Sequence, residues 1–515
     1  MKLQFLGAAT TVTGSQFLLT TDDAAVIVDC GMFQGSPSDS ERNRVPPIYD
    51  AGAIDAIVLT HAHLDHCGML PVVVRDGFRG PIYATRATVE LAGLVLLDSA
   101  KVQMEQARDR RQRNERLARE GRSHPHGDAD TAQHAGAMPA AAASDDPAHA
   151  DHDAESAVRH QPAELDTTIA EPLYDVHDSE RAIERFVGVE YGQPVACAPG
   201  ITATLHDAGH ILGSAIVILD VEEAGVSRRL VFSGDLGRPG TPILRDPTAI
   251  IDGADYVLME STYGGREHEP EEEAIRMLAQ AVSAVAERHG VLLIPAFAIG
   301  RTQEIVWELD RLVASGAIPH VPLYLDSPMA SKASDIYRRY PGYYDEETHR
   351  LLEAGETPID YPGAVVTNTP EASRAIAKAP RPLMIVAASG MLTGGRIVHH
   401  LRTFIDDPAA TLLFVGYQGQ GTLGAHLQAG AKQVRLDGQL REVRCQVRSI
   451  SGFSAHADEH ELIAWLSHLA QAPRRPRLVF LVHGDPDAEE AMVPMVKAIG
   501  LEPYRPTWRE TVILG

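Results

Sequence analysis

The 515-residue sequence lacks long apolar runs and has few cysteines. No run of 18 or more apolar residues occurs, so a membrane span is not expected. The four cysteines, at positions 30, 67, 197 and 445, form no CxxC pair. This spacing argues against a disulfide framework and favours a reducing compartment. The N-terminal residues contain no continuous apolar segment, so we expect no signal peptide and a cytoplasmic location.

Basic residues are also scarce. The chain has 46 Lys and Arg against 70 Asp and Glu, a formal net charge of −24. A strongly acidic protein repels polyanions at long range. A nucleic-acid substrate would therefore require a local cationic groove or bound metal ions. The length predicts two or more domains.

Short β-branched runs, each bounded by Gly, Pro or Asp, predict buried strands. These runs are residues 24–29, 54–60, 214–220, 229–235 and 256–262. Several end in a polar side chain, namely Asp29, His61, Asp235 and Glu260. Polar groups on loops above a rigid sheet are typical of functional sites.

Two later regions differ in pattern. Residues 266–448 alternate between helical and strand-like segments, which predicts a parallel α/β sheet. Residues 108–170 begin with a charged stretch that could be helical and continue as an Ala-, Asp- and His-rich stretch. The second stretch has too few large apolar residues to form a core, so we predict a disordered insertion.

The segment HAHLDH contributes four potential metal ligands, His61, His63, Asp65 and His66. Imidazole and carboxylate suit a borderline ion such as zinc, and one ion cannot easily use four ligands spaced so closely. Two metals that share a bridging carboxylate are therefore expected. Further potential ligands follow other strand-like runs, namely His206, His210, Asp235 and His483. Cys30 and Cys67 lie beside these motifs, but we predict that they are small buried hydrophobic residues.

The motifs HAHLDH, AGH, SGD and VDCG resemble those of the metallo-β-lactamase fold. EST at 260–262, GFSAHAD at 452–458 and LVHGD at 481–485 resemble the three added motifs of its β-CASP branch. PAFAIGRTQE, YLDSPMA and SGMLTGGRIVHHL are similar to stretches of that branch's RNA-processing members. The resemblance covers nearly the whole chain outside about 108–170. It is strongest to bacterial and archaeal relatives of the nuclease subunit of the cleavage and polyadenylation specificity factor.

The resemblance implies an α/β fold with a metallo-β-lactamase αββα core. The core would comprise residues 1–265 and 449–515, and a parallel α/β β-CASP domain, residues 266–448, would be inserted into it. The active site would lie in the cleft between these parts.

The resemblance also implies a role for each motif residue. One zinc would be held by His61, His63 and His210, the other by Asp65, His66 and His483, and Asp235 would bridge them. Asp29 would orient the ligands. Glu260 would hydrogen-bond His456, the general acid. Manganese stays open as an alternative metal. We expect His206, His399, His400 and His460 to be structural or exposed.

The implied activity is hydrolysis of single-stranded RNA by a water that bridges two metals. His483 supports RNA, because the DNA-processing members have an apolar residue at this position. Endonucleolytic cleavage is the first expectation, because no KH-like segment precedes Met1 and no long domain follows His483. Three alternatives stay open: a 5′-to-3′ exoribonuclease of ribonuclease J type, a hydrolase of small esters or thioesters, and a non-catalytic RNA-processing subunit. No membrane partner is expected, and a homodimer stays open.

Several residues are weaker candidates for substrate contacts. Ser389, Gly390 and Thr422 could approach phosphates. Arg301 and Arg396 could pair with substrate charge, and structural salt bridges are the alternative. The glycines at 419, 421 and 424 match GxGxxG, with Asp437 eighteen residues beyond the first of them. We expect phosphate approach or close packing here rather than dinucleotide binding.

Overall fold

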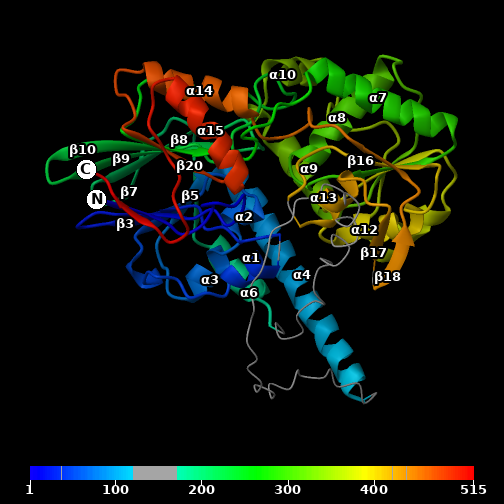
Figure 1. The fold of residues 1–515 in the computed structure, drawn as a ribbon, viewed down its shortest axis with the longest axis horizontal. Coiled ribbons are helices and arrows are strands. Elements are labelled where there is room, and N and C mark those ends of the chain that lie inside the picture. Colours follow the sequence, from blue (N-terminus) through cyan, green and yellow to red (C-terminus); the bar gives the residue numbers. More distant parts are fainter. Residues whose placement is uncertain (36, 120–170, 420, 437) are drawn as a thin grey trace, which may run out of the picture.

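The computed structural model describes residues 1–35, 37–119, 171–419, 421–436 and 438–515. Two seven-stranded sheets pack face to face, helices cover their outer faces, and a third sheet lies beside them (Figure 1). This arrangement confirms the predicted αββα sandwich and the predicted parallel α/β part. The five apolar runs predicted as strands form β3, β4, β9, β10 and β11.

The first sheet has the spatial order β22-β1-β2-β3-β4-β5-β6. Its strands are β1 (Lys2–Phe5), β2 (Phe17–Thr20), β3 (Ala25–Val28), β4 (Ala56–Val58), β5 (Ile82–Thr85), β6 (Phe186–Val189) and β22 (Thr511–Ile513). The pairs from β22 to β3 are antiparallel, and those from β3 to β6 are parallel. The β22–β1 pair brings the two ends of the chain into one sheet (Figure 1).

The second sheet has the order β21-β20-β11-β10-β9-β8-β7. Its strands are β7 (Val195–Ala198), β8 (Ile201–Asp207), β9 (Ala215–Glu223), β10 (Val226–Phe232), β11 (Tyr256–Glu260), β20 (Leu478–Val482) and β21 (Pro503–Tyr504). Large side chains of both sheets, including Phe5, Phe17, Phe232 and Phe480, form the core between them. Because β10, β11 and β20 are parallel, their carboxyl ends lie at the same edge.

Helices cover the outer faces of the sandwich. Those associated with the first sheet are α2 (Leu64–Cys67), α3 (Leu70–Arg75), α4 (Arg86–Arg119) and α6 (Val176–Ile183). The second sheet is covered by α14 (Glu459–Gln471) and α15 (Pro486–Ala498). Two short elements, α1 (Pro37–Arg42) and η1 (Ala51–Ala53), lie in the loop before β4. The charged stretch that begins at Arg108 is helical and extends α4, whereas residues 120–170 of the predicted insertion lie outside the described residues.

The third sheet is entirely parallel, with the order β14-β13-β15-β12-β16-β19. Its strands are β12 (Val291–Pro295), β13 (Leu323–Leu325), β14 (Val365–Val366), β15 (Leu383–Ala387), β16 (Ala410–Phe414) and β19 (Gln446–Ser449). The central strands β12, β15 and β16 are fully buried, which explains their continuous apolar sequences.

One face of the third sheet packs against α7 (Glu271–Glu287) and α8 (Arg301–Ala314). The other face packs against α12 (Gly395–Phe404), α13 (Leu423–Gln428) and the hairpin of β17 (Gln433–Leu436) and β18 (Gln439–Glu442). The connecting elements are α9 (Pro328–Arg339), η3 (Pro341–Tyr343), α10 (Glu346–Glu353), α11 (Pro370–Ala375) and η4 (Ile376–Lys378). Among the described residues, no helix is both long enough and apolar enough to cross a membrane.

A buried carboxylate joins several elements of the third sheet. Asp326 follows β13 and is completely buried. It accepts hydrogen bonds from Arg396 Nη1 at 2.7 Å and His400 Nε2 at 2.6 Å, both on α12, and from the hydroxyls of Thr367 and Ser373. Burial alone would raise the pKa of Asp326, but these donors hold it below its usual range. The ionised carboxylate therefore stabilises the packing of α12 beside β13.

Replacing Asp326 with Asn should lower the free energy of unfolding by about 3 kcal/mol near pH 7, because Arg396 and His400 lose their buried anion. The folded-state pKa lies below the unfolded value of about 3.9, so this stabilisation is present above that value and is lost as the pH falls through the folded pKa. Urea unfolding at a series of pH values should show the difference between the two proteins shrinking below about pH 4. The exposed Asp335→Asn should change stability by less than about 0.5 kcal/mol. A deficit that stays constant at low pH would contradict the assignment.

Candidate metal centre

The HAHLDH segment folds into a tight turn after β4. His63 is the N-cap of α2, and its carbonyl accepts hydrogen bonds from the backbone N–H groups of His66 and Cys67. The turn packs closely on the VDCG segment, since a Cβ at Gly31 would lie 1.6 Å from the Asp65 carbonyl oxygen. Only glycine fits at this position, which explains sterically why the VDCG motif ends in glycine.

The remaining candidate ligands also follow strands. His210 lies in the loop after β8, Asp235 follows β10, and His483 directly follows β20. The backbone N–H of His483 donates to the carbonyl of Ala8 at 2.7 Å, which ties its loop to the first sheet. His483 has a φ of 50°, a left-handed conformation that is uncommon for residues other than glycine. All seven predicted metal ligands are thus brought to one region between the two sheets.

A first group of ligand atoms comes from His61, His63, His210 and Asp235, within 4.8 Å of one another. His63 Nδ1 lies 3.1 Å from His61 Nε2 and 3.2 Å from His210 Nε2. Asp235 Oδ2 lies 3.4 Å from His61 Nε2 and 3.6 Å from His210 Nε2. Ligand atoms of a tetrahedral zinc lie about 3.3 Å apart, so these distances match a zinc site.

A second group lies on the other side of the same carboxylate and contains Asp65, His66 and His483. The Nε2 atoms of His66 and His483 are 3.3 Å apart, and Asp65 Oδ2 is 3.7 Å from His483 Nε2. Asp235 Oδ1 lies 3.3 Å from His66 Nε2. Asp235 therefore faces both groups, one with each oxygen.

The protonation of these side chains fits metal binding. Burial lowers the pKa of His61 and His210 well below the usual histidine value and that of His63 to about 4, so these rings are neutral near pH 7. Asp235 Oδ1 is buried and has no hydrogen-bond partner among the described residues. Neutral imidazoles and carboxylates are zinc ligands, so the donor set fits two adjacent zinc ions that share Asp235.

Hydrogen bonds orient the rings from behind. His66 Nδ1 donates to Asp29 Oδ2 at 2.7 Å, and His210 Nδ1 donates to the carbonyl of Ala455 at 3.0 Å. The Nε2 lone pair of each ring is thus left facing the cluster. Asp29 is itself buried and accepts from the backbone and hydroxyl of Thr60 and from Ser15 Oγ. Asp29 thus contacts His66, and its role in orienting the ligands stays a prediction.

Sequence reasoning missed three supporting hydroxyls. Thr60 Oγ1 lies 3.1 Å from His61 Nδ1, Ser15 donates to Asp29, and Thr262 Oγ1 lies 3.1 Å from His483 Nδ1. Thr60 and Thr262 are direct neighbours of motif residues, so their position in the sequence offered a signal. Ser15 offered none, because its contact with Asp29 depends on the pairing of β2 with β3.

His456 and Glu260 form a pair beside the first group. His456 Nδ1 donates to Glu260 Oε2 at 3.1 Å, and the rings of His456 and His210 are 4.6 Å apart. Burial lowers the pKa of His456, but the negative charges of Glu260 and Asp235 outweigh it and raise the pKa to about 9. Its side chain is 18% exposed, so a protonated imidazole remains accessible beside the metal ligands. His268, which sequence reasoning also missed, donates through Nε2 to the His456 carbonyl at 3.0 Å.

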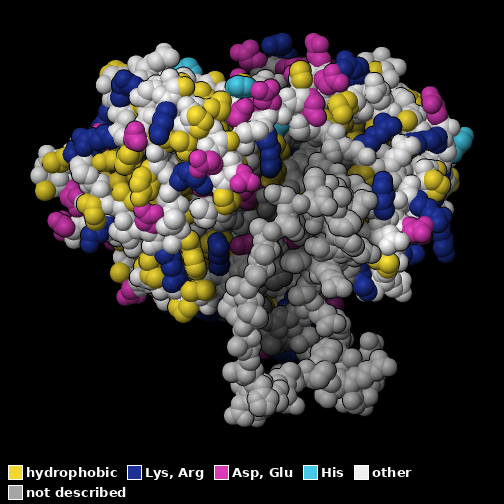
Figure 2. All heavy atoms as spheres, viewed as in Figure 1, with side chains coloured by type: hydrophobic (Ala, Val, Ile, Leu, Met, Phe, Trp, Pro, Cys, Tyr) yellow, Lys and Arg dark blue, Asp and Glu magenta, His cyan; other side chains and the backbone are white. Residues whose placement is uncertain are grey.

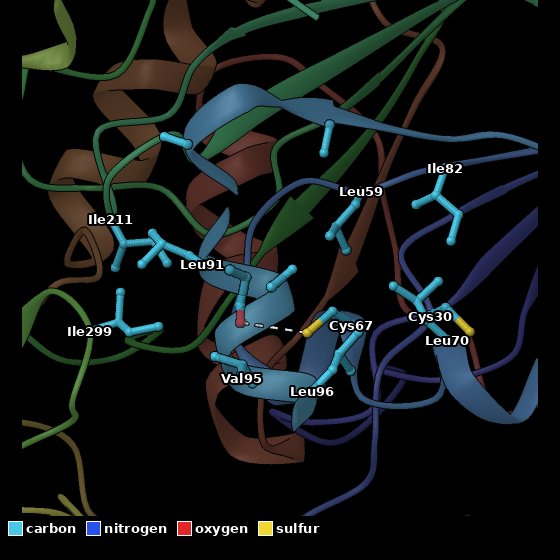
Figure 3. Close-up of a cluster of buried hydrophobic side chains, with 14 of the residues drawn as sticks. Cys30, Leu59, Cys67, Leu70, Ile82, Leu91, Val95, Leu96, Ile211 and Ile299 are labelled. Atoms are coloured by element: carbon cyan, nitrogen blue, oxygen red, sulfur yellow. Dashed lines mark hydrogen bonds between the residues drawn. The ribbon is translucent and has the colours of Figure 1, made fainter. Parts of the chain in front are cut away.

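The residues predicted to be structural lie outside both ligand groups. His206 is partly buried on β8, His399 is partly exposed, His400 is bonded to Asp326, and His460 is exposed beside Glu267. Cys30 and Cys67 are buried among aliphatic side chains, as Figure 3 shows, and Cys67 Sγ contacts the Ala62 carbonyl. Both side chains are completely buried, which confirms that the cysteines are core residues, and this burial raises the pKa of both thiols.

The candidate substrate residues occupy different environments. Arg301 is buried and paired with Glu304, and Arg396 donates to Asp326, so both take part in structural ion pairs. Ser389 is partly exposed. Gly390 packs on the ring of Phe297, whose centroid is 6.2 Å from that of His63.

The glycine-rich segment caps a short helix. Thr422 Oγ1 accepts from the Ala425 N–H and thereby caps α13. A Cβ at Gly424 would lie 1.7 Å from Gln418 Oε1, so this glycine permits close packing, one of the two predicted roles. Asp437 lies outside the described residues.

A small pocket beside the first ligand group is lined by residues of both the sandwich and the part that contains the third sheet. Gly209 and His210 of the sandwich line one side, and Gly300 and Tyr337, from the segments around the third sheet, line the other. The candidate site therefore borders both parts, in agreement with its predicted position.

Three family models match the chain. Residues 9–136 match the metallo-beta-lactamase superfamily, residues 302–427 match the Beta-Casp domain, and residues 441–506 match the Zn-dependent metallo-hydrolase RNA specificity domain.

Curated relatives match over nearly the whole chain. Ribonuclease TTHA0252 of Thermus thermophilus is 36% identical, over 97% of this chain and 96% of the relative. Transcription termination factor FttA of Methanosarcina mazei is 29% identical, over 97% of this chain and 69% of the relative. FttA of Pyrococcus horikoshii is 31% identical, over 94% of this chain and 66% of the relative.

Asp235→Asn should reduce zinc bound to the purified protein at both ligand groups, because each group loses a carboxylate oxygen. Mass spectrometry of metal content should show a fall from about two zinc ions per chain to less than one. His206→Gln, four residues before His210 but outside both groups, is the matched control and should retain the wild-type content. Full zinc content in Asp235→Asn would contradict the shared position of this carboxylate.

Proposed function

Because the chain belongs to the β-CASP branch of the metallo-β-lactamase superfamily and matches the Zn-dependent metallo-hydrolase RNA specificity domain, we propose that it cleaves single-stranded RNA at internal phosphodiester bonds. The observation that carries the proposal is the His456–Glu260 pair beside seven convergent metal ligands. A purely metal-storing site has no need of a positioned acid. The name ribonuclease, borne by a relative that matches over nearly all of both chains, agrees with this function.

In this proposal the two ligand groups would hold two zinc ions. His61, His63 and His210 would bind one, Asp65, His66 and His483 the other, and Asp235 both. Bound zinc lowers the pKa of water and neutralises negative charge on a phosphate. The protein's own contribution is the orientation of four of the rings: His66 by Asp29, His61 by Thr60, His483 by Thr262 and His210 by the Ala455 carbonyl.

His456 would act as the general acid. Its Nδ1 proton is held by Glu260, so the Nε2 proton is the one available for the leaving oxygen of the RNA. The raised pKa, about 9, keeps the ring protonated near pH 7. Glu260 also accepts from the Leu236 backbone N–H at 2.6 Å, which fixes the carboxylate and thereby the imidazole. Proton donation of this kind contributes roughly 10²- to 10⁴-fold in rate.

RNA is favoured over DNA because His483 occupies the position at which DNA-processing members carry an apolar residue.

We also propose that residues 1–265 and 449–515 form one domain and residues 266–448 a second. The strands of the third sheet, β12 to β16 and β19, fall within or at the end of the second range, and β20 to β22 return to the sandwich.

Cleavage of a 5′-labelled single-stranded RNA and its matched DNA tests this function. We expect internal cuts in RNA alone, abolished by a chelator and restored by zinc or manganese. Release of single nucleotides from the 5′ end would replace the endonuclease with a 5′-to-3′ exonuclease. Hydrolysis of small esters by a fully metallated protein that leaves RNA intact would favour the ester hydrolase, and RNA binding without any cleavage would favour the non-catalytic subunit.

His456→Ala should retain both zinc ions and lose cleavage by about 10²- to 10⁴-fold, because only the proton donor is removed. Single-turnover rates and metal content are measured on the same preparation. The exposed His460→Ala, four residues further on, is the matched control and should keep wild-type activity. Loss of metal from His456→Ala would contradict the general-acid role.

A further inference from the structure

Around the third sheet, one segment of this acidic chain carries a net positive charge. From the start of α11 to the end of β19, residues 370–449 contain ten Lys and Arg and five Asp and Glu, a net charge of +5. The whole chain carries −24, so the remainder carries −29. A polyanion near this protein is therefore repelled by the net charge of the remainder and attracted by this segment.

The positive charges lie on one face of the third sheet. Val434 and Leu436 of the hairpin pack into the core that α12 and α13 share, and Arg435 between them is exposed. We define the basic face as five residues of α12, the hairpin and its flanks: Arg402, Lys432, Arg435, Arg441 and Arg444. Lys and Arg side chains gather over β17 and β18 in Figure 2. The opposite face of the sheet is covered by α7, which begins with three glutamates.

The path from the candidate metal centre to the basic face starts at an exposed aromatic ring. Phe297 is 38% exposed, and its ring centroid is 6.2 Å from that of the metal ligand His63. The backbone of Gly390 packs directly on this ring, so the loop after β15 adjoins the cluster. An exposed aromatic ring beside a phosphate-binding centre suits stacking by a base of single-stranded nucleic acid.

Helix α12 completes the path. The N–H of Ile397 in its first turn donates to the Ala388 carbonyl of that loop. Ten residues of helix span about 15 Å. Near its other end, the Arg402 carbonyl accepts from Arg441 Nη2 of the hairpin at 3.4 Å. The metal centre and the basic face are thus linked by consecutive contacts.

The ion pairs on this face can be exchanged for phosphates. Arg441 lies 3.5 Å from Asp406, with the two side chains 38% and 47% exposed, and Arg444 pairs with Glu442, at 62% and 56% exposure. Exposed pairs of this kind contribute little to stability, so little is lost when the arginine binds another anion.

We propose that the basic face binds the phosphates of single-stranded RNA beyond the cleavage site. The inference rests on the proposed function, which supplies the substrate. It explains how a chain of net charge −24 can hold an RNA that extends beyond the few nucleotides at the metal centre. The ligand is RNA backbone rather than base edges, so binding is salt-dependent and insensitive to sequence.

The test compares RNAs of about six and about 24 nucleotides that share one cleavage site. In the triple variant Lys432→Gln/Arg435→Gln/Arg441→Gln, kcat/KM for the long RNA should fall by about tenfold at 0.15 M salt. The slope of log kcat/KM against log salt concentration should become less negative by about two. Cleavage of the short RNA should not change. The control Lys332→Gln/Arg338→Gln/Arg350→Gln, which neutralises three exposed side chains of α9 and α10, should affect neither.

An equal loss on short and long RNA, or no loss on long RNA, would overturn the proposal. Binding of the long RNA, followed by fluorescence anisotropy, separates this outcome from failure of the proposed catalysis. If the wild-type protein cuts neither RNA but the triple variant still binds the long RNA more weakly with a shallower salt dependence, the basic face stands and the catalytic proposal falls. Unchanged binding by the triple variant would overturn the basic face alone.

Discussion

The six other candidate zinc ligands of the described centre are positioned around one buried carboxylate, Asp235. Imidazoles from the HAHLDH turn, the β8 loop and the β20 loop reach it only because the two sheets pack face to face. A buried carboxylate oxygen without a hydrogen-bond donor, as at Asp235 Oδ1, is costly, and a bound cation would compensate it. The aromatic core between the sheets therefore determines the geometry of the chemical site as well as the stability of the fold.

The sequence predicted the parts of this arrangement that depend on local pattern. β-branched runs located the strands, and the polar residues that follow several of these runs located part of the candidate metal centre. Contacts formed by tertiary packing alone could not be predicted. Ser15 behind Asp29, His268 behind the His456 backbone, and Asp326 beneath α12 are polar residues whose partners are distant in the sequence. The cysteines beside the motifs were correctly predicted as core residues, since no further thiol or CxxC spacing supported a ligand role.

Net charge alone is a poor guide to the partners of this protein. The chain as a whole is acidic, but residues 370–449, which supply one face of the third sheet, carry a net positive charge. Such a separation gives an anionic polymer a preferred orientation as it approaches, because attraction and repulsion act on different parts of the surface. The net negative charge then keeps copies of the protein apart in solution, and the distribution of charge orients an approaching anionic polymer.

The distance in sequence between the ligands has a consequence for synthesis. His66 and His483 are separated by 417 residues yet lie 3.3 Å apart, and the loop of His483 is fixed by a backbone hydrogen bond to Ala8. A ribosome that has not yet passed residue 483 therefore carries a nascent chain with an incomplete ligand set. The messenger RNA is itself single-stranded and lies close to that chain. The ribosome must translate this RNA past codon 483 before the fold can assemble a complete centre.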